Sequence, residues 1–133
     1  MFGASPGSYI LLVNEMTNRQ LSRTVEVLKA LAHPSRLRII AMLASGELCV
    51  CQLTAVLGQA VSTVSAHLTE LRRAGLVTEQ KEGRFVSYRL AAGRETKTLL
   101  QRVRALAASD AQLEADAALV RGLRPVGVEE LCR

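Results

Sequence analysis

The sequence has few aromatic residues, no tryptophan, and no apolar run long enough to span a bilayer. Aromatic residues make up 3% of its 133 residues, although apolar residues together reach 49%. A hydrophobic core must therefore consist of aliphatic side chains, a composition that favours helices. The apolar run near the start, residues 9–13, is far shorter than the ~20 residues that a membrane-spanning helix needs. It also lacks a basic flank, so we expect a single domain with no signal peptide and no contact with a membrane.

Cysteine is also scarce. The chain has three cysteines, an odd number, and two of them are separated by a single residue. This pattern excludes a secreted disulfide framework and favours free thiols in a reducing cytoplasm. The sequence also lacks a phosphate-binding loop, paired carboxylates and a histidine suitably placed to activate a cysteine, so we do not expect an enzyme.

Basic residues are concentrated in one part of the chain. The formal net charge is +5, and residues 59–104 alone contain nine Lys/Arg against four Glu, which gives 9 − 4 = +5. From residue 110 onwards, five acidic residues outnumber three arginines. A basic middle section indicates a polyanionic partner, and nucleic acid is the commonest one.

The spacing of apolar residues predicts a mainly α fold with one small β-hairpin. We expect helices over residues 18–32, 34–44, 47–57, 60–74, 94–107 and 110–121, with Asp110 as the N-cap of the last one. Two strands are expected over residues 76–80 and 85–90, joined by a turn at Glu82-Gly83. A short helix, a turn at Gly58 and a longer helix form a helix-turn-helix, and the basic hairpin after it forms the wing of a winged helix.

Three regions follow from this pattern. Residues 1–17 are expected to form a flexible or dimer-packing arm, and residues 18–107 the winged helix-turn-helix domain that binds DNA and dimerises. Residues 108–133 are expected to form a C-terminal helix and a tail that carries Cys132. The spacing of Leu21, Val25 and Leu28 predicts one apolar face on the first helix, and that of Val61, Val64, Leu68 and Leu71 predicts the core side of the fourth. Arg36 and Arg38 are expected to face outward.

The other face of the fourth helix is small and polar, so it can approach the major groove of DNA closely. The hairpin adds basic side chains near its tip. The predicted DNA-binding residues are Ser62, Thr63, Ser65, Ala66, His67, Thr69 and Arg73 on the helix, and Lys81 and Arg84 on the hairpin.

Three segments carry a resemblance to a known family: residues 31–39 (LAHPSRLRI), 47–51 (ELCVC) and 62–68 (STVSAHL). In their order and spacing they resemble the ArsR/SmtB family, bacterial metal-sensing winged-helix repressors. The resemblance covers roughly residues 18–107. It implies a homodimer formed through the first and late helices, which binds a palindromic double-stranded operator and leaves it when a metal binds.

The resemblance also suggests where the metal binds. One family site uses paired histidines and carboxylates on the late helix, and this chain has no histidine after His67. Another uses the Cys-Val-Cys motif, present here as Cys49 and Cys51. The best-known arsenic-type motif has a third cysteine three residues later, where this chain has Thr54. Cys132, from the same chain or from its partner, is the candidate replacement.

Thiolates favour soft ions over calcium or magnesium. Trivalent arsenic or antimony needs only three thiolates, as the arsenic-sensing relatives suggest, whereas a closed zinc or cadmium site takes four ligands. We therefore predict an arsenic-released repressor with Cys49, Cys51 and Cys132 as ligands. The alternatives are a repressor that senses cadmium, lead or another thiophilic ion, and a thiol redox switch in which Cys49 or Cys51 pairs with Cys132.

Helix geometry adds a condition for any such site. Residues i and i+2 of a helix lie about 200° apart, so the sulfurs of Cys49 and Cys51 would point away from each other. One ion can bind both only if the first turn of the third helix is absent or unwinds. We therefore expect ion binding to distort this turn and change the spacing of the two DNA-reading helices.

Overall fold

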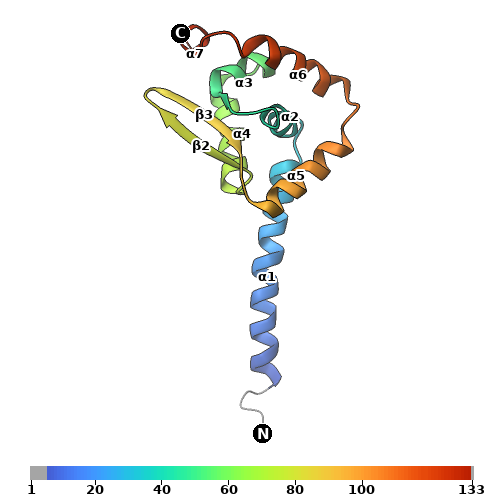
Figure 1. Ribbon diagram of the computed structural model, residues 1–133. Coiled ribbons are helices and arrows are strands. Elements are labelled where there is room, and N and C mark those ends of the chain that lie inside the picture. The colour runs from blue at the N-terminus through green and yellow to red at the C-terminus, as the bar shows by residue number, and fades with distance from the viewer. Residues whose placement is uncertain (1–5, 133) are drawn as a thin grey trace.

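The computed structural model describes residues 6–132, with side chains described from residue 18 onwards. It is a mainly helical fold with one small antiparallel sheet, as the sequence predicts (Figure 1). The helices are α1 (Pro6–Leu31), α2 (Pro34–Leu43), α3 (Val50–Leu57), α4 (Val61–Arg73), α5 (Arg94–Leu106), α6 (Ala111–Leu123) and α7 (Val128–Leu131). The strands are β1 (Leu48–Cys49), β2 (Val77–Glu82) and β3 (Phe85–Leu90).

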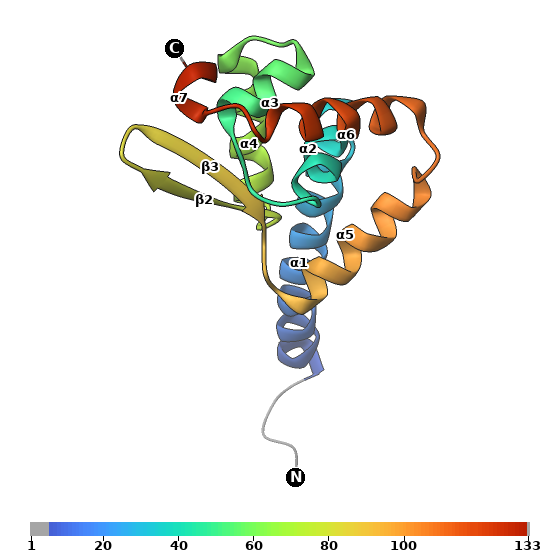
Figure 2. The same ribbon diagram turned by 45° about the horizontal axis from the view of Figure 1, so that its top comes forward.

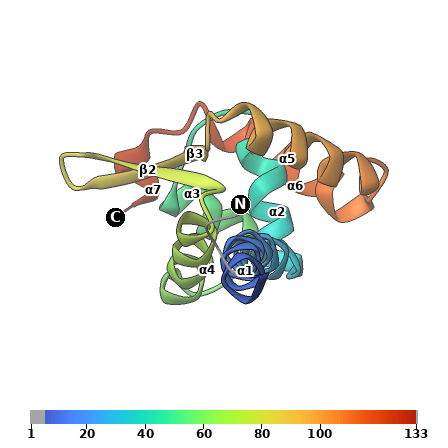
Figure 3. The same cartoon turned by 90° about the horizontal axis from the view of Figure 1, so that it is seen from below.

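The predicted boundary between arm and domain is not visible in the structure. Helix α1 begins at Pro6 and runs without interruption to Leu31, so the helix that was expected to begin at residue 18 starts earlier. Residues 1–5 of the predicted arm lie outside the described residues. Helix α1 projects from the rest of the molecule (Figure 1) and lies next to α4 when seen along its axis (Figure 3). The division into three regions otherwise stays a prediction.

The sheet contains one strand more than the sequence predicts. Its order is β1-β3-β2, and Leu48 and Cys49 of β1 pair with Tyr88 and Ser87 of β3. The prediction that the third helix begins at Glu47 is therefore wrong, because α3 starts only at Val50. In the hairpin, Glu82 pairs with Phe85, so the two-residue turn is Gly83-Arg84 and not Glu82-Gly83.

The helix-turn-helix forms where it was predicted. Helix α3 ends at Gly58, whose φ of 64° is a left-handed conformation that glycine adopts without a steric penalty. In α4, Val64, Leu68 and Leu71 are fully buried. Val61 was predicted to join them but is 59% exposed, because it begins the helix and lies beyond the edge of the core.

Helix α2 lies in the middle of the fold, between the DNA-reading elements and the C-terminal helices (Figure 2). Its residues Ile39 and Ile40 are completely buried, together with Leu53 of α3 and Leu100 of α5. The aliphatic core that the composition predicts is therefore one continuous cluster.

A buried ion pair attaches α6 to α2. The guanidinium of Arg38 donates to both carboxylate oxygens of Asp116, at 2.8 and 2.9 Å, and Asp116 is only 1% exposed. The prediction that Arg38 faces outward is wrong because this bidentate contact draws it inward, and the same contact raises the pKa of Arg38. Asp110 is confirmed as the N-cap of α6, since its side chain accepts from the backbone N–H groups of Gln112 and Leu113.

Replacing Asp116 should therefore cost more stability than replacing an exposed acid on the same helix. We expect Asp116→Asn to lower the free energy of unfolding by about 3 kcal/mol, because it leaves a half-buried guanidinium without its counter-charge. Glu114→Gln, an exposed position two residues away, is the matched control and should change stability by less than about 0.5 kcal/mol. Urea unfolding of both reduced variants measures the difference, and equal losses would contradict the role given to the pair.

Candidate thiolate site and nucleic-acid surface

The three cysteines, far apart in the sequence, lie together in the structure. The sulfur atoms of Cys49, Cys51 and Cys132 are all within 4.8 Å of one another. A metal–sulfur bond of about 2.3 Å holds two ligating sulfurs roughly 3.5–4 Å apart. Once reduced, the three thiols could therefore converge on one thiophilic ion with displacements of about an ångström.

Cys49 meets the geometric condition without any unwinding of a helix. It belongs to β1 and is the N-cap of α3, with extended backbone angles (φ −84°, ψ 162°), whereas Cys51 lies in the first helical turn. The backbone N–H of Cys49 donates to the side chain of Gln52 at 2.9 Å, which closes this end of the helix. Of the two conditions, an absent or an unwound first turn, the structure therefore meets the first at Cys49, and a distortion of α3 on ion binding stays a prediction.

Cys132 reaches the site from the same chain. It follows the short helix α7, which lies beside α3 (Figures 1 and 2), and it forms a disulfide with Cys51. The Cα atoms of this pair are 5.5 Å apart, within the usual range for a disulfide. Cys49 is the remaining free thiol of the three and is 5% exposed.

A surface hollow of about 640 Å³ lies beside Cys49. It is formed by β1, the base of α3, the hairpin and the segment that leads into α7. Three carboxylates, those of Glu47, Glu82 and Glu129, line it. The approach to the sulfur cluster on this side is therefore acidic and favours a cation over a neutral species.

Hydrogen bonds connect the cysteine strand to the hairpin, and an ion pair connects the hairpin to α4. Cys49 pairs with Ser87 of β3, and the Ser87 hydroxyl donates to the carboxylate of Glu47. On the next residue of β3, the Tyr88 hydroxyl donates to Glu79 of β2 at 2.6 Å, and Arg72 of α4 lies 3.6 Å from the same carboxylate oxygen. Burial and the Glu79 carboxylate raise the pKa of Tyr88 to about 12, so it donates throughout the physiological range. The sequence gives no signal for the link between Cys49 and Ser87, because it depends on the pairing of β1 with β3, whereas Tyr88 and Glu79 face each other within the predicted hairpin.

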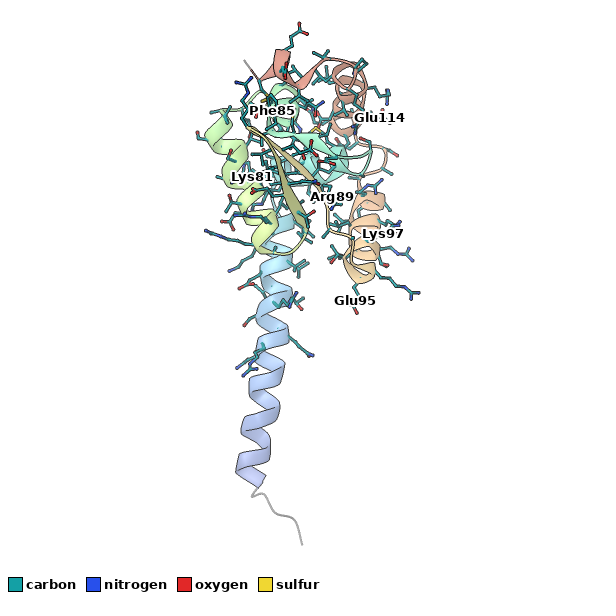
Figure 4. The ribbon with its side chains drawn as sticks, turned by 60° about the vertical axis from the view of Figure 1, so that its left-hand side comes forward. Lys81, Phe85, Arg89, Glu95, Lys97 and Glu114 are labelled. Carbon is teal, nitrogen blue, oxygen red and sulfur yellow. A yellow bond between two sulfur atoms is a disulfide. The ribbon has the colours of Figure 1, made fainter. Side chains whose placement is uncertain are left out.

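The residues predicted to bind DNA lie on accessible parts of α4 and the hairpin. Ser62, Thr63, Ala66, Arg73, Lys81 and Arg84 are exposed, and Ser65, His67 and Thr69 are half-buried. The Thr69 hydroxyl donates to the Ser65 carbonyl at 2.9 Å, which occupies its proton within the helix. Figure 4 shows Lys81 and Arg89 on the hairpin and Lys97 on α5.

His67 has a structural partner that the sequence did not reveal. Nη1 of Arg36 lies 3.3 Å from Nδ1 of His67, and the His33 ring stacks at a centroid distance of 4.4 Å. A guanidinium can only donate, so this hydrogen bond requires a neutral His67 ring with its proton on Nε2. Burial, then the nearby His33 and Arg36, lower the pKa of His67. Arg36 also donates to the carbonyls of Lys29 and Ala30, which ties α2 to the end of α1.

Helices α1 and α5 both present apolar side chains to solvent. Leu21, Val25 and Leu28, the predicted apolar face of α1, are exposed in the single chain, and Leu106 of α5 is 89% exposed. Leu99 and Val103 of α5 are partly buried against the core. Within residues 6–132, no helix combines the length and the hydrophobicity needed to cross a bilayer.

Comparison with known proteins gives a family match and three informative similarities. The sequence model of the bacterial regulatory protein arsR family matches residues 33–79. The chain is 43% identical over 67 residues to the arsenical resistance operon repressor of Escherichia coli K12, a match that covers 50% of this chain and 57% of that protein. The chain thus spans about half the length of the first curated relatives that it matches.

The other two similarities, to a Vibrio cholerae protein and to a Mycobacterium bovis domain, extend over most of the length of those proteins. The transcriptional activator HlyU of Vibrio cholerae is 40% identical over 80 residues, which is 60% of this chain and 73% of HlyU. A structure of HlyU superimposes with a TM-score of 0.62 at 37% identity, covering 68% of this chain and 97% of that one. The homodimeric winged helix-turn-helix DNA-binding domain of a possible ArsR-family regulator from Mycobacterium bovis gives a TM-score of 0.61 at 33% identity, covering 81% and 91%.

The His67 environment predicts a loss of stability in acid. Because the folded state binds a proton at His67 less readily than the unfolded chain, stability should fall as the pH drops through the ordinary imidazole value of 6.5. We expect His67→Asn, whose side-chain oxygen can accept from Arg36, to lose less stability than the wild type between about pH 7.5 and about pH 5.5. Urea unfolding at both pH values measures this, and carboxylate effects common to both proteins cancel. An identical pH dependence of the two proteins would refute the assignment.

Proposed function

Because the chain belongs to the arsR family of bacterial regulatory proteins, we propose that it is a homodimeric repressor that trivalent arsenic releases from operator DNA. The ion is bound by the thiolates of Cys49, Cys51 and Cys132. The observation that carries this proposal is the convergence of three sulfurs within 4.8 Å, although one of them comes from the far end of the chain.

The donor set fits trivalent arsenic well. Three soft thiolates complete the pyramidal coordination of arsenic(III) or antimony(III), and no fourth ligand group joins the cluster among the described residues. The identity to an arsenical resistance operon repressor supports the same choice. A thiolate site of this kind requires reduced cysteines, which agrees with the cytoplasmic location expected from the sequence.

Operator DNA is read by α4 and the hairpin. The exposed small and polar side chains of α4, Ser62, Thr63 and Ala66, would enter the major groove. Lys81 and Arg84 on the hairpin would contact the phosphate backbone, which adds a steep dependence of the affinity on salt. The neutral His67 ring keeps an Nε2–H that can donate to a phosphate or a base.

The coupling between ion and DNA would pass through the sheet. An ion that binds Cys49 acts on β1, which pairs at Ser87 with β3, the central strand of the sheet. From there, Tyr88 and Glu79 lead to Arg72 at the end of α4. A displacement of β1 would therefore change the angle between the hairpin and α4, the two elements that must fit the DNA together.

Cadmium or lead remains the second candidate for the inducing ion. The acidic hollow beside Cys49 supports it, because carboxylates attract a divalent cation and not neutral arsenous acid. Thiol redox control is supported by the Cys51–Cys132 disulfide, which removes two of the three ligands. In that case peroxide would release DNA with no ion added.

The ion hypothesis predicts both a thiol count and a loss of DNA affinity. Arsenite should protect three thiols per reduced chain and weaken binding to a duplex selected from a random pool by about 10-fold or more. Cys49→Ser should abolish the release, because it removes the ligand that lies on β1, the strand paired with β3. Thiol titration and fluorescence anisotropy with labelled DNA measure the two effects.

Thr54→Ser, a change on the same helix that leaves all three sulfurs in place, is the control and should behave as the wild type. Unchanged DNA affinity and no protected thiol in the presence of arsenite would reject arsenic as the inducer. The same titration with cadmium, lead and peroxide then separates the alternatives.

The exposed apolar residues of α1 and α5 are the proposed dimer interface. Replacing Leu28, 56% exposed in the single chain, with Glu should shift the protein towards monomer, since a charge is poorly tolerated in the apolar centre of an interface. The control Ser22→Glu adds the same charge at an exposed polar position of α1. Analytical ultracentrifugation at micromolar concentration compares them. A dimer as stable in Leu28→Glu as in the control would place the interface elsewhere.

A further inference from the structure

Arg124 lies at the end of α6 and touches the segment that leads into the cysteine strand. Its Nη1 donates to the backbone carbonyl of Glu47 at 3.1 Å, and its Nη2 donates to the hydroxyl of Ser45 at 2.8 Å. The Ser45 hydroxyl in turn donates to the Met42 carbonyl at the end of α2. One guanidinium thus connects α6 to the loop between α2 and β1, two residues before Cys49.

The loop between α2 and β1 has a glycine where it lies against the Arg124 guanidinium. Gly46 has a φ of 132°, which favours glycine, and a Cβ at that position would lie 3.3 Å from Nη2 of Arg124. The backbone of the loop therefore approaches the guanidinium more closely than a larger residue would allow.

Among the described residues, Arg124, itself exposed, is the last one before Cys132 whose side chain hydrogen-bonds to another segment. Upstream, Asp116 and Val120 fix α6 to the core. Downstream, the chain turns at residues 125–127 and forms the single turn of α7, whose residues are at most half-buried. We propose that Arg124 is a positioning residue that holds Cys132 in register with Cys49 and Cys51. The part of this inference that concerns ion binding rests on the proposed function.

The size of the effect separates a positioning role from a simple tether. Suppose that the segment before Cys132 were only a loose tether. It spans 8 residues from its attachment at residue 124, and loss of the Arg124 contact would lengthen it to 12 residues, counted from residue 120. Effective concentration falls as roughly the −3/2 power of length, so the loss would be only about twofold. Loss of a fixed geometry should cost about 10-fold, because two hydrogen bonds from a charged group hold it.

The test measures arsenite binding to the reduced full-length protein. In Arg124→Ala we expect two protected thiols instead of three, a weaker sulfur-to-arsenic charge-transfer band in the ultraviolet, and about 10-fold weaker binding. Arg124→Lys, which can still donate to one acceptor, should recover part of each effect. Arg121→Ala is the matched control, an exposed arginine on the same helix, and should behave as the wild type.

A second measurement does not depend on the ion. In a glutathione buffer, the Cys51 and Cys132 thiols react with oxidised glutathione to give the protein disulfide and two reduced glutathione molecules, so atoms and electrons balance. The midpoint of this equilibrium reports the effective concentration of Cys132 at Cys51. Arg124→Ala should lower the effective concentration of Cys132 at Cys51 about 10-fold, and Arg121→Ala should leave it unchanged.

The two measurements separate the failure of this inference from that of the proposed function. A wild type that binds no arsenite, combined with the expected shift in glutathione, would remove the ion and keep the role of Arg124. Three protected thiols in Arg124→Ala, with arsenite binding and the glutathione midpoint within about twofold of the wild type, would overturn that role. Circular dichroism and urea unfolding verify that each variant folds.

Discussion

The attachment of α6 to α2 is the constraint on which the cysteine cluster depends. The Arg38–Asp116 pair sits where the polypeptide returns to the core after α5, and it is nearly closed to solvent on the carboxylate side. Such a pair stabilises little compared with apolar residues of the same size, but it is specific, because any other docking of α6 leaves a buried carboxylate unpaired. Cys132, sixteen residues further on, can lie near Cys51 because α6 is docked against α2 in this position.

The sequence predicted those parts of the fold that depend on local pattern. Helices α2, α4, α5 and α6 begin and end within a few residues of their expected positions because each carries its own apolar stripe and its own stop signals. Strand β1 was not predicted, since a two-residue strand has no periodicity and exists only through its pairing with β3. The inward turn of Arg38 was missed for the same reason, because its partner lies 78 residues away.

The candidate site shows the same division. Cys49 and Cys51 were identified from their spacing and from a family resemblance. These two signals can be read from neighbouring residues in the sequence alone. Cys132 lies beside them in the same chain because of the way α6 and α7 dock, and local sequence patterns do not predict that docking. Cys49 escapes the helical geometry that would separate the two sulfurs because strand pairing, a long-range interaction, holds its backbone extended.

All three sulfurs of the cluster belong to one polypeptide. This separates ion binding from subunit association, two equilibria that are often linked. An ion held across a subunit boundary would favour association, so its apparent affinity would rise with protein concentration. In the proposed site each subunit contains a whole cluster, so dissociation of the subunits would remove no ligand from it. A cell could then change the amount of this protein, and with it the fraction that is dimeric, without taking a ligand away from any ion site.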